Sequence, residues 1–553
     1  MKTLQAHKRT RAQESSGAIE RLYITMRHLF NRGFYKPMGI SGESLRESLL
    51  ILRPEIYGSI AEEKIELQGL LYVIDRLPYG IEECTYINLT SDEGYHQSHF
   101  KPIIPLKRRR NCYRIDAEQM NIEITRGRSE IYDILTHLTF LYIESHKIMK
   151  QVLINDRGDV IRDWEKLEEA VVHKKKLTQK DKEIALTHTA NFLGRTFEEV
   201  SEIYPEFACK EDEHRFLKII YYLGKGALTE TLTQTKRLIT FSPVLRERLG
   251  HHIHGDRWAL RIKKVLHEKQ WLDRPLHIIS ANMHSVMNSL FAEKALSATE
   301  KKDKTPLQWY ETLSKPDQFK LREKVTKCAL QHGMVYLKDE SGTNIDVQLF
   351  DAEKIKAFED PSEAPIILVM DYAFGEQAYE TMDELLRPYE TNEGKKYLKV
   401  SSISIMGKAG ILDGGKGDIM IPSSHIFEGT ADNYPFKNKL KKSQFPADMN
   451  VCSGAMITVL GTSLQNRDIL RFFHRSTWNV IGLEMEGAHY QKAIQAASKI
   501  RGSISSKVVV RYAYYASDNP LESGSTLASG GLGTTGVKPT YLITEKILEQ
   551  IFK

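Results

Sequence analysis

Short apolar runs rich in β-branched residues alternate with helical segments from about residue 274 to the end of the chain. The apolar runs span residues 276–280, 334–337, 345–349, 366–370, 400–406, 418–421, 456–460, 480–483 and 508–515. Segments with helical periodicity span residues 284–296, 318–331, 376–386, 485–498 and 539–552. Alternation of this kind predicts an α/β domain with a central sheet flanked by helices, because each layer buries its apolar face against the next.

The first half of the chain has a different pattern. Between residues 15 and 221 the apolar residues recur mostly at intervals of three and four, as in Ile19, Leu22 and Met26. This spacing predicts helices with one buried face. A single hydrophobic core stops growing at about 250–300 residues, so a chain of 553 residues should form two large domains. We therefore expect a mainly α-helical N-terminal domain over residues 1–272 and an α/β domain over residues 273–553.

The net charge, the cysteines and the lack of long apolar stretches exclude several classes of function. The net charge of +6 is small for this length, so we do not expect nucleic acid as a partner, whereas small anionic ligands fit. The five cysteines form no CxxC pair, and no stretch has the roughly 18 consecutive apolar residues of a membrane span. The basic, polar first residues also lack the apolar core of a secretory signal. We expect a cytoplasmic protein without a membrane segment.

The candidate metal ligands in the sequence are the histidines at positions 251, 252 and 254. No carboxylate or cysteine stands at a ligand spacing that would complete a tetrahedral set. The sequence therefore predicts no metal site.

Small residues follow the predicted strand at 400–406. The segment contains Gly407, Lys408, Ala409 and Gly410. Small residues at the end of a strand let the backbone approach a flat ligand closely, although a tight turn without a functional role would use the same residues.

Carboxylates follow two further predicted strands. Glu484, Met485 and Glu486 stand where an apolar strand runs into a helix, and Ser517 and Asp518 end another apolar run. A carboxylate at such a place can accept hydrogen bonds from a vicinal diol, and a buried acid can donate a proton. The alternative interpretations are a helix N-terminus that favours negative charge and an ordinary turn.

Taken together, in this order and spacing, the three segments resemble the purine nucleoside phosphorylase and nucleosidase superfamily. The run 407–410 followed by 417–419 is similar to its glycine-rich strand pair, 484–486 to its Glu-Met-Glu ribose motif, and 517–518 to its Ser-Asp purine motif. Residues 517–521 are most similar to the AMP nucleosidases. Gly375 and the strand at 276–280 extend the resemblance more weakly, so that it covers residues 276–553. It implies a central mixed sheet flanked by helices.

The resemblance also implies roles for individual residues. Glu486 would hold the ribose hydroxyls, with Glu484 in the same motif, Met485 would pack on the sugar, and Asp518, next to Ser517, would protonate or hydrogen-bond a purine base. The implied reaction cleaves the N-glycosidic bond of a purine nucleoside or nucleotide, in a homo-oligomer and without a cofactor.

Departures from the family pattern separate three hypotheses. Ile405 stands where phosphorolytic members carry an arginine, and Lys408 replaces a phosphate-binding serine, so we expect hydrolysis. Lys408 would then pair with a 5′-phosphate or remain a solvated surface lysine. Residues 282–285 lack the water-activating glutamate of hydrolytic members, which leaves His284 as the candidate base. The alternatives are a degenerate sensor that binds a purine ligand and a phosphorylase with a relocated phosphate site.

Overall fold

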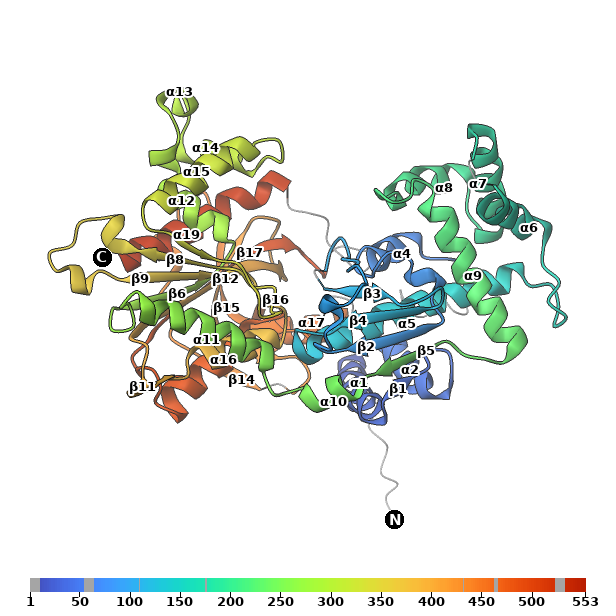
Figure 1. Ribbon diagram of the computed structural model, residues 1–553, viewed down its shortest axis with the longest axis horizontal. Coiled ribbons are helices and arrows are strands. Elements are labelled where there is room, and N and C mark those ends of the chain that lie inside the picture. Colours follow the sequence, from blue (N-terminus) through green and yellow to red (C-terminus); the bar gives the residue numbers. More distant parts are fainter. Residues whose placement is uncertain are drawn as a thin grey trace, which may run out of the picture. The chain divides into compact units, whose positions relative to one another are not determined.

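The computed structural model describes residues 10–53, 64–108, 110–174, 177–430, 432–461, 466–522 and 533–553. These residues form two compact units (Figure 1). The first contains the described residues up to Leu249, and the second begins at Gly250. Helix α11 (Ile253–Glu268) therefore belongs to the second unit.

The first unit is mainly helical, as the sequence predicts. Its helices are α1 (Arg11–Arg32), α2 (Ile40–Leu52), α4 (Leu67–Ile74), α5 (Gly127–Val152), α6 (Arg162–Glu168), α7 (Gln179–Leu193), α8 (Phe197–Ile203), α9 (Arg215–Thr233) and α10 (Pro243–Arg248). In α1 the apolar residues at three- and four-residue spacing, among them Ile19, Leu22 and Met26, are buried. Thr10 and Gln13 form a capping box at the start of that helix. Among the described helices of the whole chain, none combines the length and the apolar character that a membrane crossing requires.

A five-stranded sheet, which the sequence analysis does not predict, completes the first unit. Its strands are β1 (Phe34–Tyr35), β2 (Tyr86–Thr90), β3 (Cys112–Arg114), β4 (Gln119–Glu123) and β5 (Leu238–Phe241), in the order β1-β5-β2-β4-β3. Strand β2 runs parallel to both β4 and β5, so these three strands end at one edge of the sheet. Helix α5 begins just beyond the end of β4 at that edge.

The second unit has the predicted α/β class, with a mixed ten-stranded sheet. Its strands are β6 (Leu276–Ser280), β7 (Val335–Leu337), β8 (Val347–Asp351), β9 (Ile366–Met370), β12 (Val400–Ile411), β13 (Ile419–Phe427), β14 (Asn433–Pro435), β15 (Val451–Thr458), β16 (Val480–Glu484) and β17 (Val509–Asp518). The helices that pack on it include α12 (Met283–Ala295), α15 (Phe319–Gln331), α16 (Gln377–Leu385), α18 (Gly487–Gln495) and α19 (Val537–Ile551). A separate hairpin is formed by β10 (Tyr389–Thr391) and β11 (Gly394–Lys396).

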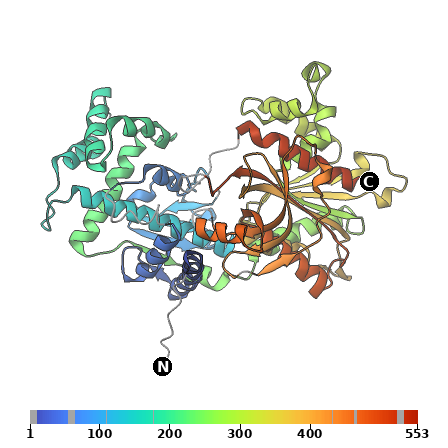
Figure 2. The ribbon, with the colours of Figure 1, turned by 180° about the vertical axis from the view of Figure 1, so that it is seen from behind.

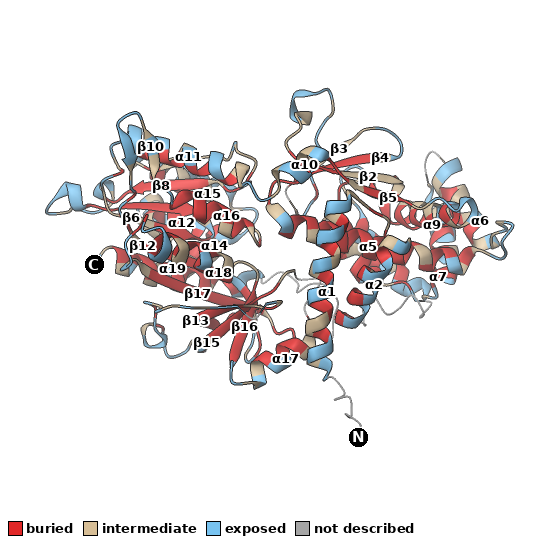
Figure 3. Cartoon of the chain, turned by 90° about the horizontal axis from the view of Figure 1, so that it is seen from below, coloured by how far each residue is buried: buried red, intermediate tan, exposed pale blue. Residues whose placement is uncertain are grey.

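Five of these strands form a closed ring of pairings. Strand β12 pairs with β17, β17 with β13, β13 with β15, β15 with β16, and β16 again with β12. The curl of this part of the sheet is visible in Figure 2. Apolar clusters lie on both faces of the sheet, and Figure 3 shows its strands as buried. Burial on both faces leaves the ends of the strands as the places where polar side chains can gather.

Candidate active site

The three segments singled out in the sequence meet at Gly410. This residue, near the end of β12, lies opposite Leu483 of β16 on one side and opposite Asp518 of β17 on the other. A Cβ atom at position 410 would lie 2.8 Å from Leu483 Cδ2 and 3.1 Å from Pro520 Cγ. A larger residue would force the Leu483 side chain to move, so glycine favours the close approach of the three strand ends.

Glu484 ends strand β16 and is almost fully buried. Its carboxylate accepts hydrogen bonds from the Thr458 hydroxyl, from the N–H of Glu486 at 2.5 Å and from the N–H of Gly487. Burial raises the pKa of Glu484 to about 8, and the charge of Glu486 acts in the same direction. Oε2 thus holds the turn between β16 and α18 in place, and Oε1 connects Glu484 to Thr458 at the end of β15.

Glu486 stands two residues further on, directly before α18, and is half-buried like Met485. Its Oε1 accepts a hydrogen bond from the N–H of Gly375 at 3.0 Å. Gly375 has a φ of 54°, in the left-handed region that favours glycine, in the turn before α16. A carboxylate has about four lone-pair positions, so it can accept several hydrogen bonds, including bonds from hydroxyl groups.

Asp518 ends strand β17 and is half-buried, whereas Ser517 before it is buried. The Ser517 hydroxyl oxygen lies 2.6 Å from Asp518 Oδ1 and 3.1 Å from the carbonyl oxygen of Ala409. Ser517 therefore links the aspartate to the neighbouring strand β12, at the edge where Gly410 lies.

The other residues predicted on β12 differ in exposure. Gly407 is buried, and a Cβ there would come within 3.5 Å of Tyr372 Cε1. Lys408 is exposed, and no residue in the described part of the chain forms an ion pair with it. Ile405 is buried in the core, so a cationic side chain is not available at that position.

His284 lies in the first turn of α12, where the Asn282 side chain accepts its backbone N–H at 2.9 Å. His284 keeps contact with solvent, and the part of its ring that is covered by protein lowers its pKa below the ordinary value. Asp371 opposes this shift electrostatically. Strands β6 and β9 are parallel neighbours, with Ser280 opposite Met370, so the residues that follow them emerge at the same edge.

Sequence reasoning missed Asp371, Glu428 and Thr458. Asp371 directly follows β9, and Glu428 directly follows β13, so a search for carboxylates after apolar strands would have found both. Glu428 donates its backbone N–H to the carbonyl oxygen of Thr458 at 3.1 Å. Its carboxylate is buried without a hydrogen-bond partner among the described residues, and burial raises the pKa of Glu428 to about 8. Thr458 has no comparable signal in the sequence.

His252 has carboxylate neighbours that the sequence does not predict. Its Nδ1 lies 3.3 Å from Glu384 Oε1, and Asp383 completes a group whose ligand atoms lie within 4.8 Å of one another. Arg501 lies 2.7 Å from Asp383, and Arg387 lies 3.1 Å from Asp383 and 3.4 Å from Glu384. Because two guanidinium groups already balance the two carboxylates, the cluster is an ion-pair network.

Solved structures that resemble the chain are nucleosidases and phosphorylases, each matching about half of it. The 5′-methylthioadenosine/S-adenosylhomocysteine nucleosidase of Campylobacter jejuni is 10% identical over 50% of this chain and 97% of its own, with a TM-score of 0.30. Isoform 2 of uridine phosphorylase from Schistosoma mansoni is 12% identical over 51% and 89%, with a TM-score of 0.31. A futalosine hydrolase mutant of Helicobacter pylori is 10% identical over 50% and 98%, with a TM-score of 0.28.

No curated protein matches the chain. A family model does match it, over residues 43–311 and 293–553, and thus over most of both units. The chain belongs to the family of unknown function DUF6909.

Proposed function

We propose that the second unit hydrolyses the N-glycosidic bond of a purine nucleoside or nucleotide. The observation that carries this proposal is the convergence of three strand ends at Gly410, which brings Asp518 and the Glu484–Glu486 turn to one edge of the sheet. Open α/β sheets bind their ligands at such an edge. The side chains gathered there are acids and acceptors, which suits a substrate with hydroxyl groups and a leaving group that needs a proton.

The sugar would be held by Glu486. Its Oε1 contacts Gly375, and because a carboxylate can accept several hydrogen bonds, Glu486 suits the 2′- and 3′-hydroxyls of ribose. Glu484 acts as a positioning residue, because its bonds to the N–H groups of residues 486 and 487 set the turn on which Glu486 stands. Met485, half-buried between them, offers an apolar surface for the sugar ring.

The departing base would be served by Asp518. Breaking a C–N glycosidic bond leaves positive charge on the ribose and negative charge on the base. An acid beside the base stabilises that charge by donating a proton or a hydrogen bond, and purine N7 is an acceptor suited to it. Ser517 restricts the carboxylate to one orientation through its short contact with Oδ1.

Water is the nucleophile in this proposal. The buried Ile405 supplies no positive charge for a phosphate ion, which phosphorolysis would need at this position. His284 and Asp371 follow neighbouring parallel strands, and the carboxylate raises the basicity of the imidazole against the effect of burial. We assign the activation of water to this pair.

A panel of purine nucleosides and 5′-nucleotides, incubated with and without phosphate, tests the proposal by release of free base. Hydrolysis predicts base and free ribose, or ribose 5-phosphate from a nucleotide, without any need for phosphate. Asp518→Asn should lower the rate of base release by roughly 100-fold or more. Asp448→Asn, which changes an exposed carboxylate of the same unit, should leave the rate unchanged.

Two other outcomes favour the alternatives. Formation of ribose 1-phosphate that depends on added phosphate would identify a phosphorylase with a relocated phosphate site. Tight binding of a purine ligand without any base release would identify a sensor, and failure of every purine compound to bind would end the proposal.

A further inference from the structure

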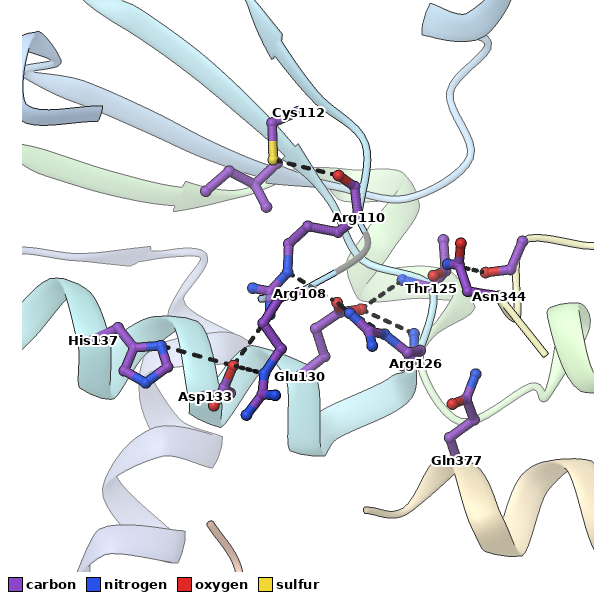
Figure 4. Close-up of polar contacts among 12 residues, drawn as sticks. Arg108, Arg110, Cys112, Thr125, Arg126, Glu130, Asp133, His137, Asn344 and Gln377 are labelled. Atoms are coloured by element: carbon purple, nitrogen blue, oxygen red, sulfur yellow. Dashed lines mark hydrogen bonds and ion pairs between the residues drawn. The ribbon is translucent and has the colours of Figure 1, made fainter. Parts of the chain in front are cut away.

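Arginines gather at the edge of the first unit's sheet where its three parallel strands end. Arg108 and Arg110 precede β3 and lie beside the end of β4, and Arg126 stands directly before the long helix α5 (Figure 4). Arg76 joins them electrostatically through Asp133 and Arg108. We call these four residues the arginine cluster.

Two carboxylates on α5 hold the cluster together. Arg110 lies 3.3 Å from Glu130 and 3.1 Å from Asp133, and Arg108 lies 3.2 Å from Asp133. Arg126 lies 2.8 Å from Glu130. Figure 4 shows the arginine side chains converging on the two acids.

The positive charges outnumber the negative ones. His137, next to Asp133, adds no charge at neutral pH, because burial lowers its pKa to about 4. Asp75 also acts electrostatically on Arg76, but Lys107 lies 3.9 Å from this acid. When both are counted, the four guanidinium groups and Lys107 face the carboxylates of residues 75, 130 and 133, which leaves an excess of two positive charges among these described residues.

Arg110 shows the imbalance at the level of atoms. Its side chain is fully buried, and although its Nε lies 3.3 Å from Glu130 Oε1, its Nη1 has no hydrogen-bond partner among the described residues. In the Arg237–Glu230 pair of the same unit, one arginine meets one acid, and Nε is the atom of Arg237 that is left without a described hydrogen-bond partner. A buried guanidinium normally has acceptors for its protons, so Nη1 of Arg110 can still bind an oxygen atom of an anion.

We propose that the arginine cluster binds the phosphate group of a ligand, either inorganic phosphate or the phosphate of a nucleotide. Guanidinium groups match phosphate oxygens with paired hydrogen bonds, and the start of a long helix adds a positive electrostatic field. A ligand would reach the cluster past Arg108 and Arg126, whose side chains are 18% and 9% exposed to solvent. The side chain of Arg110 is fully buried. A phosphate dianion would balance the two excess charges.

Calorimetric titration of the full chain tests this inference. The titrants are inorganic phosphate, ADP and adenosine. Arg108→Met and Arg110→Met should each weaken binding of the phosphate-bearing titrant by about 10-fold or more, the usual effect of losing charge-assisted hydrogen bonds. Arg114→Met is the matched control, since Arg114 pairs with Glu83 at a part-exposed place in the same unit and should leave binding unchanged.

The titrants separate the sources of the phosphate group. Binding of inorganic phosphate that depends on Arg108 identifies the free ion, and binding of ADP alone with the same dependence identifies a nucleotide. Adenosine binding should not respond to either variant. Should Arg110→Met fail to fold, Arg108→Met decides by itself, because its side chain is partly exposed. The inference is overturned if no phosphate compound binds, or if binding is the same in wild type and Arg108→Met.

Discussion

The two units place opposite charges at equivalent positions of their sheets. In the second unit, acids follow the strands, among them Asp518, Glu484 and Asp371. In the first unit, Arg110 and Arg126 flank the end of β4. Both edges are where parallel strands end and helices begin, so the backbone position alone does not select a chemistry. The charge of the side chains determines which ligand an edge can bind. Carboxyl groups accept hydrogen bonds from hydroxyl groups and can donate protons, whereas guanidinium groups bind anions.

The two edges are also assembled differently. At the first edge, the arginines and acids that contact one another directly lie between residues 108 and 133, mostly on one strand-to-helix connection. The acids of the second unit come from strands that are far apart in the sequence, since β9 ends at Met370 and β17 ends at Asp518. Changes at the first edge should therefore affect mainly stability and anion binding, and changes at the second mainly catalysis.

Glu130→Gln should give the largest effect. It removes a fully buried acid from Arg110 and Arg126, and breaking such a pair costs about 3 kcal/mol or more of unfolding free energy. Urea unfolding followed by fluorescence measures this, with Trp164 reporting on the first unit and the other four tryptophans of the chain on the second. Glu83→Gln, at the part-exposed pair with Arg114, is the control and should cost less than about 1 kcal/mol.

The same variant has a pH signature. The arginines hold the pKa of Glu130 below its ordinary value despite burial. A lowered pKa contributes stability above the ordinary pKa of glutamate, and this contribution is lost as the pH falls through the native value. The difference between wild type and Glu130→Gln should therefore shrink in acid. A difference that grows as the pH falls would contradict the charge assignment.

Asp518→Asn should lower turnover by roughly 100-fold or more, equivalent to about 2.7 kcal/mol of transition-state stabilisation. The fold should be unchanged, because the amide keeps the shape and can still contact Ser517. Steady-state base release with a matched circular dichroism spectrum measures both. Near-normal turnover in a folded variant would remove Asp518 from the mechanism and make the second edge structural.

Substrates without a 2′-hydroxyl should be used about 5- to 150-fold less well, because a carboxylate that loses a donor gives up about 1–3 kcal/mol. Glu486→Gln should reduce this preference for ribose. Glu484→Gln provides the comparison: it should lower kcat/KM for both sugars and leave their ratio unchanged, since Glu484 only positions the turn. If the wild type used ribose and 2′-deoxyribose substrates equally well, Glu486 would only stabilise the N-terminus of helix α18 and would not bind the sugar.

Lys408→Met should give the smallest effect. If the exposed Lys408 pairs with a 5′-phosphate, the variant should raise KM for nucleotides by up to about fivefold and leave nucleosides unaffected. Lys416→Met, at another exposed lysine, is the control. The same KM for nucleotides in wild type and variant would make Lys408 a solvated surface residue.

Periodicity predicted the second unit well because several of its strands are short, buried apolar runs. The runs at 276–280 and 366–370 coincide with β6 and β9, and the predicted helix at 284–296 differs from α12 by one residue at each end. The site motifs could be located once the strands were predicted, because glycines and acids after such strands contrast with the apolar residues before them. Their mutual contact could be expected only through the family resemblance, since pairing of β12 with β16 and β17 is a long-range property.

The sheet of the first unit could not be predicted in this way. Its strands β2 and β4 carry Asn88 and Asn121 at their centres, and β5 has only four residues, so no run of apolar residues marks them. The helices around them dominate the local pattern. Thr458 was missed for a related reason: its role lies in the contact with Glu484, 26 positions away in the sequence, and a threonine at a strand end is otherwise ordinary.

Strand β17 lies between β12 and β13 in the ring and carries Asp518 at its end. Among the described residues it is the last strand in the order of synthesis: it begins at Val509, whereas β12 ends at Ile411. A ribosome-bound chain that does not yet include β17 would therefore have an open ring and would lack Asp518. Contacts between segments so distant in sequence form slowly, because the intervening chain must first be ordered. The proposed hydrolytic activity should accordingly appear late in folding.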